Sequence, residues 1–508
     1  MDMREWPASL FSTLVGVGVA LWAQYSYADT AKTTATTPIH IGYSSPPKTL
    51  DPLLAADSAG ARILQLTHPA LLKYSATYAP IGNVATGCVQ PTLQRIECTL
   101  PPGRTFTNGK ALTAPVVAQW LGTIQATPRS PLAGALRGIS ISAPNVAQLV
   151  FMLPSPTLGF MNILTELPLA DPSATTHGAG PYSATTDETT GVITLTPRTP
   201  NLPALQFSPL ADPTTRLLKL QKGEFDVLLN DLPPSVVNHA ERNAATTGLR
   251  RITLPSTGYT YLALNFNNPY LAQGSVREAL SLALNRPLLR KALLNNKAQA
   301  AQSLLPPGHA AYWAAPEDPY DVMSAEAVLD DTQLPDGRTL LMGPDGARLN
   351  LTLLTSTEPF SQRLAQALQA QWAEAGVAVA LESAEWGTFF SRVQAGRFDM
   401  ALMTWTGEQH PEFYARVFAS TNTPPNGFNR GNVRDVELDV LLNTLTAAPT
   451  LAAQQAATVA VQQRVAALRP YLPLWRRDNV LMMGRGIMGC TLTPSGDYRG
   501  LTTCRKLK

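Results

Sequence analysis

The sequence predicts an α/β protein with more than one lobe. Alternating apolar residues predict one strand at residues 349–354 and a second at residues 377–381. Between them, Leu364, Leu368 and Trp372 recur at intervals of four, which predicts a helix with one apolar stripe. These elements form a β-α-β unit. A chain of 508 residues is too long for one hydrophobic core, so we expect two or three lobes.

Local signals bound the helix of this unit. Ser356 or Thr357 is the candidate N-cap, and Pro359 stands near the first turn, where its missing amide costs little. Gly376 is the expected stop, because glycine adopts the left-handed conformation that ends many helices.

Two tryptophans follow, nineteen positions apart. Trp386 precedes a short expected helix that runs to residue 393, and Trp405 follows an expected strand at residues 398–402. Glu408 comes three residues after the second tryptophan. Because the two rings lie near the ends of neighbouring elements, we expect an aromatic-lined cleft with a carboxylate at its rim.

This stretch resembles the family 5 solute-binding proteins, which are the extracytoplasmic dipeptide and oligopeptide receptors of bacterial ABC importers. The motifs are the run from Glu385 to Phe390, the turn at residues 396–399, and Trp405 with its later carboxylate. Similar motifs occur at residues 50–52, 103–114, 178–182 and 425–431. The resemblance covers nearly all of the chain after the leader. It implies a two-lobed periplasmic-binding-protein fold, type II-like, with an extra inserted subdomain.

We therefore expect a discontinuous first lobe, an inserted subdomain and a second lobe. The expected bounds are residues 29–70, 178–258 and 477–508 for lobe I, 71–177 for the inserted subdomain and 259–476 for lobe II. Strands near residues 261–265 and 472–475 should cross between the lobes and form a hinge.

Residues 1–28 have the pattern of a signal peptide. An apolar run at residues 8–23 precedes Ser26-Tyr27-Ala28, a small-x-small cleavage pattern. The run is short for a membrane span, which needs ~20 residues. The region around Arg4 also contains two acidic residues, so an uncleaved N-terminal anchor is the alternative. We expect export to the periplasm with cleavage after Ala28.

The four cysteines predict two local disulfides. Cys88 and Cys98 flank one turn, and Cys490 and Cys504 flank another, so each pair can be joined without long-range folding. An exported protein lives where disulfides persist. We expect these two pairs among the three possible connectivities; free thiols are the alternative.

The composition and the motifs argue against several functions. The net charge is +3 without a basic run, so nucleic acid is not an expected partner. Metal-protease, nucleophile-elbow and phosphate-loop motifs are absent from the sequence, and the six histidines lie far apart. We expect no catalytic residues, no metal and no cofactor. A secreted hydrolase remains open, because the members of a catalytic triad need not be close in sequence.

Glu408 is the sharpest site prediction that the resemblance implies. In peptide-binding relatives an aspartate at this position accepts the α-ammonium of the peptide, a charge-assisted bond that contributes ~1.5–3 kcal/mol. An exposed rim glutamate is the alternative. His410-Pro411-Glu412 stands where many relatives have Asp-Pro-Asp, which leaves the ligand class open. His410 is either a ligand contact, with affinity that depends on pH between about 5 and 8, or a surface residue.

Other candidates lie nearby. The two tryptophans line the cleft or belong to the core. Tyr259 and Tyr261 alternate along an expected strand, so they face the cleft together or not at all; core packing is the alternative. Arg430 either meets a ligand carboxylate or pairs with Asp435, and we expect the pairing.

The resemblance implies a monomeric extracytoplasmic receptor of an ABC importer. It would bind a short peptide or another small molecule in a cleft between hinged lobes and deliver it to an inner-membrane ABC permease complex. A ligand drives closure only by binding the closed form better than the open one. The same fold with a metal chelate, haem, an opine or a sugar is the alternative, and a secreted hydrolase is a third.

Overall fold

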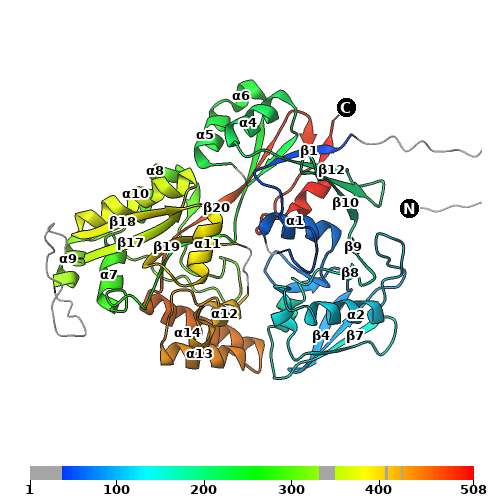
Figure 1. The fold of residues 1–508 in the computed structure, drawn as a ribbon, viewed down its shortest axis with the longest axis horizontal. Coiled ribbons are helices and arrows are strands. Elements are labelled where there is room, and N and C mark those ends of the chain that lie inside the picture. Colours follow the sequence, from blue (N-terminus) through cyan, green and yellow to red (C-terminus); the bar gives the residue numbers. More distant parts are fainter. Residues whose placement is uncertain are drawn as a thin grey trace, which may run out of the picture. The chain divides into compact units, whose positions relative to one another are not determined.

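The computed structural model describes most of the chain, and its fold is mixed α/β (Figure 1). The described residues are 37–55, 57–230, 232–330, 349–406, 410–424 and 427–507. The predicted leader, residues 1–28, lies outside the described residues, and so does Glu408. Among the described residues, no helix combines the length and the apolar character that crossing a bilayer requires.

One sheet of 12 strands runs through the described residues. Its main path, in spatial order, is β10 (Tyr182–Asp187), β11 (Val192–Pro197), β12 (Leu205–Pro209), β1 (Ile39–Tyr43), β13 (Val227–Leu229), β20 (Tyr471–Met483), β15 (Tyr259–Leu264), β19 (Met400–Trp405), β17 (Leu349–Ser356) and β18 (Val377–Ala384). Two further strands, β14 (Arg250–Pro255) and β16 (Ala298–Gln299), also pair with β20.

The long strand β20 joins the two halves of this sheet (Figure 1). Its last residue, Met483, lies opposite Val227 of β13 and Arg250 of β14. Its first residue, Tyr471, lies opposite Ala263 of β15. Because β20 is hydrogen-bonded into both halves, it is where a hinge movement between them would bend the chain.

The structure contains the expected β-α-β unit. β17 and β18 pair in parallel, and α10 (Pro359–Glu374) connects them. Gly376, with φ +73°, follows the helix as expected. The N-cap prediction is wrong: the cap is Glu358, whose side chain accepts a hydrogen bond from the Ser361 amide. Ser356 still belongs to β17, so the strand continues past the position where we expected the helix to be capped.

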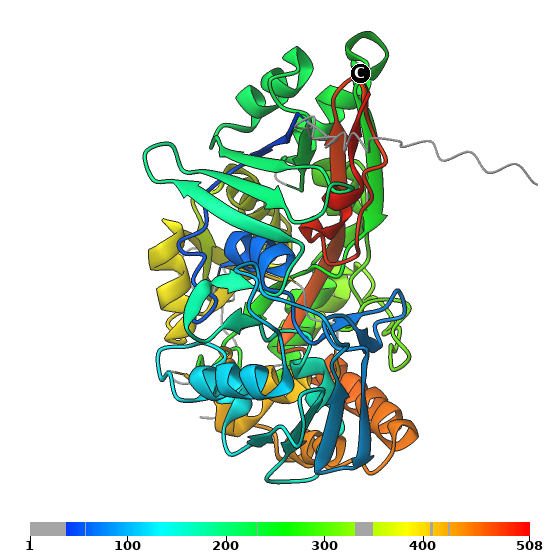
Figure 2. The same cartoon turned by 90° about the vertical axis from the view of Figure 1, so that its right-hand side faces the viewer.

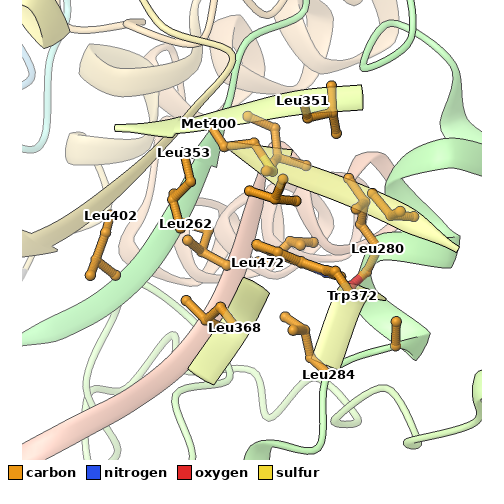
Figure 3. Packing of buried hydrophobic residues seen from close by; sticks show 14 of the residues in the cluster. Leu262, Leu280, Leu284, Leu351, Leu353, Leu368, Trp372, Met400, Leu402 and Leu472 are labelled. Atoms are coloured by element: carbon orange, nitrogen blue, oxygen red, sulfur yellow. The ribbon is translucent and has the colours of Figure 1, made fainter. Parts of the chain in front are cut away.

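The apolar stripe of α10 packs into a core cluster beneath the sheet (Figure 3). Leu364, Leu368 and Trp372 are all buried there, together with Leu280 of α7 (Gly274–Leu282) and Leu472 of β20. The indole Nε1 of Trp372 donates to the Leu280 carbonyl oxygen at 3.0 Å, so its polar atom is satisfied within the core.

Residues 71–177 contribute a four-stranded sheet with its own core (Figure 2). The strand order is β4 (Gly87–Thr92), β5 (Arg95–Thr99), β7 (Gln148–Met152) and β6 (Ser140–Ser142). The helix α2 (Ala114–Gln125, cyan) buries Trp120 against this sheet. A separate core supports an inserted subdomain, while the exact lobe bounds remain a prediction.

The structure joins both cysteine pairs that the sequence predicts. Cys88 and Cys98 lie opposite each other on β4 and β5, with an S–S distance of 1.91 Å. Cys490 and Cys504 are joined at 2.10 Å, next to the short 3₁₀ helix η3 (Tyr498–Thr503).

The remaining elements lie around these sheets. The helices are α1 (Ser58–Thr67), α3 (Phe160–Ile163), α4 (Pro213–Lys222), α5 (Pro234–Arg242), α6 (Ala244–Thr247), α8 (Arg286–Leu294), α9 (Val322–Asp330), α11 (Trp386–Gln394), α12 (Phe413–Phe418), α13 (Val436–Thr446) and α14 (Leu451–Leu468). The short elements are β2 (Leu72–Tyr74), β3 (Pro80–Gly82), β8 (Ala170–Asp171), β9 (Ala174–Gly178), β21 (Ile487–Met488), β22 (Arg505–Lys506), η1 (Ala133–Leu136) and η2 (Ser420–Asn422).

Candidate functional site

Trp386 is the most exposed part of the predicted aromatic site. It is the first residue of α11, which Glu385 caps by accepting a hydrogen bond from the Gly387 amide at 2.8 Å. The Trp386 side chain is 56% exposed. Its ring stacks on Phe390, one helical turn later, with centroids 5.8 Å apart and planes 19° apart. The indole is therefore held in place by its own helix while much of its surface meets solvent.

Trp405 ends β19 and is packed on several sides. Its ring stacks with Tyr261 at 6.2 Å and meets the ring of Phe413 edge-on at 5.1 Å. The guanidinium of Arg430 lies 4.8 Å from the Trp405 centroid. Neighbouring side chains therefore already contact much of this ring.

Arg430 and Phe390 connect the two tryptophans. The Arg430 guanidinium lies 5.0 Å from the Phe390 centroid as well as against Trp405, and Phe390 in turn carries Trp386. Trp386, Phe390, Arg430 and Trp405 thus form one connected group, which we call the aromatic shelf. The sequence predicted that the two tryptophans would be close, but it did not single out Phe390, whose spacing of four from Trp386 on a helix was the available signal.

The predicted ion pair between Arg430 and Asp435 is wrong. Asp435 caps α13 and is held by Arg464 of α14, whose Nε and Nη2 donate to its carboxylate at 3.0 and 2.6 Å. Arg464 is 29 positions away in the sequence, and only the packing of α13 on α14 brings it there. Arg430 instead contacts rings, including Phe428 at 5.5 Å.

Tyr259 and Tyr261 lie together, as alternation predicts, with centroids 5.4 Å apart. Both are buried in a core cluster, and Tyr261 also packs against Tyr471 at 4.1 Å. Burial raises the pKa of both phenols, so both stay neutral at physiological pH. Core packing is thus what the structure shows for them, and contact with a ligand remains a prediction.

Tyr259 also lines a cavity of about 320 Å³. Its lining comes only from residues 259–318 and 414–473, so it lies within the expected lobe II. Its charged groups already have partners: Asp318 accepts from Arg469 at 3.1 Å and from Ser281 at 2.6 Å, and Arg286 donates to the Pro473 carbonyl oxygen at 2.7 Å. We assign no ligand to this cavity.

His410 lies where the segment 71–177 meets the expected lobe II. Its Nδ1 is 3.1 Å from Glu412 Oε2, and its Nε2 is 3.7 Å from Glu166 Oε1. Glu412 also accepts hydrogen bonds from Asn162 Nδ2 at 3.1 Å and from Gln454 Nε2 at 2.6 Å. A contact between residues 250 positions apart leaves no local pattern, so the sequence could not have predicted it.

A glycine makes room for this contact. A Cβ atom on Gly159 would lie 2.0 Å from the Glu412 carboxyl group. Burial alone would raise the pKa of Glu412, but the hydrogen bond and the charge of His410, together with the bond from Asn162, hold it below its ordinary value. Burial also lowers the pKa of the nearby His309 to about 4.

We find no candidate metal centre within the part of the chain that the structure describes, where no three His, Cys, Asp or Glu side chains are grouped to hold an ion. Glu408 is outside that part, so its predicted bond to an ammonium group remains a prediction.

Known proteins resemble this chain in sequence and in fold. A model of the bacterial extracellular solute-binding proteins, family 5 (middle), matches residues 79–425. A probable di/tripeptide-binding protein 5 of Pseudomonas aeruginosa is 28% identical over 299 residues, covering 58% of this chain and 54% of that protein. The chain thus spans about half the length of this curated relative.

Solved structures extend the likeness in fold to nearly the whole chain. The oligopeptide-binding protein AppA of Bacillus subtilis, in complex with a nonapeptide, has a TM-score of 0.78 and 18% identity, covering 93% of this chain and 99% of that one. NikZ of Campylobacter jejuni, in complex with Ni(L-His), has a TM-score of 0.77 and 19% identity, covering 92% and 99%. The predicted fold is confirmed, and because the family model matches more than half of its length, the chain belongs to the bacterial extracellular solute-binding proteins, family 5.

Proposed function

We propose that this protein is an extracytoplasmic receptor of an ABC importer, which binds short peptides between two lobes and delivers them to a membrane permease. Membership of a solute-binding family supports the receptor class. A relative named as a di/tripeptide-binding protein and a neighbour in complex with a nonapeptide favour peptides. The observation in this chain that carries the proposal is the aromatic shelf with its exposed Trp386.

The exposure of Trp386 is informative because a large ring left in water forgoes a favourable burial. Removing apolar surface from water contributes roughly 25 cal/mol per Å², and aromatic side chains bury 150–250 Å² each. A ring that is already oriented by Phe390 loses little conformational freedom when a ligand covers it. Aromatic walls also restrict a ligand without requiring one type of side chain, which suits a receptor of varied peptides.

We propose that the parts that move relative to each other are the lobes whose bounds the sequence predicts. Lobe I would comprise residues 29–70, 178–258 and 477–508, with 71–177 inserted and 259–476 as lobe II. The pairing of β20 with strands of both halves of the sheet supports a hinge near its middle. We further propose that the contact of Asn162 with Glu412 belongs to the closed form. To shift the population from 1:99 to 99:1, a ligand must favour that form by ~5.5 kcal/mol.

The family and the matched relative are binding proteins, and the proposal needs no chemical change of the ligand. Export, cleavage after Ala28 and a monomeric state are parts of the same proposal. Amino-terminal sequencing of the protein recovered from a periplasmic fraction would test the cleavage site, since it should begin at Asp29.

A metal chelate is the second candidate ligand, favoured by the neighbour in complex with Ni(L-His). The charge of His410 helps to lower the pKa of His309, so two imidazoles lie near the contact of the two segments. A titration with Ni²⁺ and histidine together would separate this ligand from peptides.

The deciding experiment is a thermal-shift screen of residues 29–508 with mixed peptides, followed by calorimetry on the hits. A ligand at 100 times its dissociation constant stabilises the folded state by ~2.7 kcal/mol, so a true ligand raises the melting temperature visibly. Products should be absent by mass spectrometry. A melting temperature that no peptide raises would overturn the peptide proposal, and turnover of a peptide would overturn the receptor proposal.

A further inference from the structure

Five arginines within the described residues are almost fully buried, and four of them form the same kind of hydrogen bond. The five are Arg216, Arg277, Arg286, Arg430 and Arg476. Four use backbone carbonyl oxygens as acceptors. Arg476, for example, donates to the carbonyls of Thr257, Leu304 and Leu305 at 2.6–2.9 Å. These side chains fasten segments of the fold together through hydrogen bonds to backbone carbonyl oxygens.

Arg430 is the exception. It is 5% exposed, yet no oxygen of the described residues accepts a hydrogen bond from its guanidinium, and its Nη1 is buried without a partner. Asp435, the carboxylate that the sequence predicted as its partner, is held by Arg464 at 2.6 Å. What surrounds the cation is the rings of Trp405, Phe390 and Phe428, at 4.8, 5.0 and 5.5 Å.

This arrangement is costly for a residue with a purely structural role. Burying a charge without hydrogen bonds is unfavourable, and a cation over a ring recovers only part of that cost. The rings fix the guanidinium in place but leave its donors unused. A fixed fork of N–H donors matches the two oxygens of a carboxylate, so an anionic group is the partner that this site lacks.

We propose that Arg430 is the specificity residue of the aromatic shelf and binds a carboxylate of the ligand, while Trp386 and Phe390 cover an apolar part of the same ligand. This inference rests on the proposed function and refines it, since it selects anionic solutes over neutral ones of equal size. Arg430 contacts the ring of Phe390, and Phe390 stacks on the exposed indole of Trp386, so a ligand that covers Trp386 lies close to the guanidinium.

The test compares two tripeptide pools with neutral side chains, one of free acids and one of carboxyl-terminal amides, by calorimetry. The wild-type protein should bind the acids about 10- to 100-fold more tightly. Arg430→Met should abolish this preference, and Arg430→Lys should restore only part of it because an ammonium lacks the fork. Arg416→Met is the matched control: Arg416 is exposed and lies 4.1 Å from the other ring neighbour, Phe428, and its removal should leave the preference intact. A preference that survives Arg430→Met would overturn the inference.

A second measurement decides the matter without any ligand. The ligand-free Arg430→Met protein should melt at or above the wild-type temperature, because an apolar isostere replaces an unpaired buried charge. Arg476→Met should melt lower, because it leaves backbone carbonyls unpaired. If Arg430→Met melts as low as Arg476→Met, Arg430 is structural and the inference is wrong. If the wild-type protein binds neither pool, the peptide function fails, and the melting comparison alone decides on Arg430.

Discussion

Trp386 and Trp405 occupy corresponding places in one motif but differ in what surrounds them. Trp386 begins a helix, contacts the rings of its own helix and keeps 56% of its surface in solvent. Trp405 ends a strand and is enclosed by Tyr261, Phe413 and Arg430. The difference teaches that two residues of one type at family spacing need not be packed alike: Trp405 is held among neighbouring side chains, and Trp386, which we propose as the ligand-facing ring, is exposed.

The largest expected effect is a loss of stability when the packed ring, Trp405, is removed. Trp405→Ala should reduce the free energy of unfolding by about 3 kcal/mol, because it removes a ring from well-packed neighbours. Urea denaturation followed by circular dichroism measures it. Trp386→Ala is the control and should change stability by less than about 1 kcal/mol. Equal losses of stability for the two variants would mean that Trp405 contributes no more to packing than Trp386 does.

Buried histidines provide a second contrast between packed and exposed side chains. Burial lowers the pKa of His68 to about 4, and its ring nitrogens lie 2.8 Å from Thr67 Oγ1 and 3.0 Å from the Thr175 carbonyl oxygen. Since the unfolded chain binds more protons between pH 6.5 and 4, stability is fully present above pH 6.5 and falls as the pH is lowered through this window, by about 2–3 kcal/mol.

Denaturation at several pH values checks this expectation. His68→Gln should flatten the dependence between pH 6.5 and 4, and His239→Gln, at an exposed position, should leave it unchanged. A slope that is the same in wild type and His68→Gln would show that other groups produce it; His309, whose pKa burial also lowers to about 4, would be tested next.

On the exposed side, Trp386→Ala should weaken peptide binding by about 1–2 kcal/mol, roughly a 5- to 30-fold loss of affinity. Calorimetry with a peptide from the screen measures this change, and Trp386→Phe should recover much of the affinity because it restores a ring. An unchanged affinity would remove Trp386 from the ligand site while leaving its packing against Phe390 as described.

The smallest effect concerns closure. Gly159→Ala places a Cβ 2.0 Å from the Glu412 carboxyl group and should weaken the contact between the two segments. We expect affinity to fall by about 1 kcal/mol through a lower population of the closed form. The matched control is Gly134→Ala in the same segment, where a Cβ meets nothing within 4 Å. Equal affinities for both variants would argue against a role for this contact in closure.

The local elements of the fold could be predicted from the sequence. Apolar periodicity gave the β-α-β unit correctly, because Leu364, Leu368 and Trp372 face one core through a single helix. It misplaced the cap of that helix, because pairing with β18 extends β17 through Ser356 and delays the start of the helix. Strand pairing at a distance overrode a preference that was only local.

Contacts between segments far apart in the chain could not be predicted from the sequence. Arg464 reaches Asp435 only because α13 packs on α14. With Asp435 held by Arg464, Arg430 contacts aromatic rings such as Trp405 instead. Likewise, Asn162 meets Glu412 across 250 positions. Charge type and spacing identify which residues are able to pair, but tertiary packing decides which of them do.

Small-angle scattering of residues 29–508, with and without the tripeptide acids, tests the central claim most directly. We predict that the radius of gyration falls when a ligand binds, because the lobes close about the hinge in β20. A scattering profile that stays unchanged while calorimetry shows saturation by the same peptides would contradict the account.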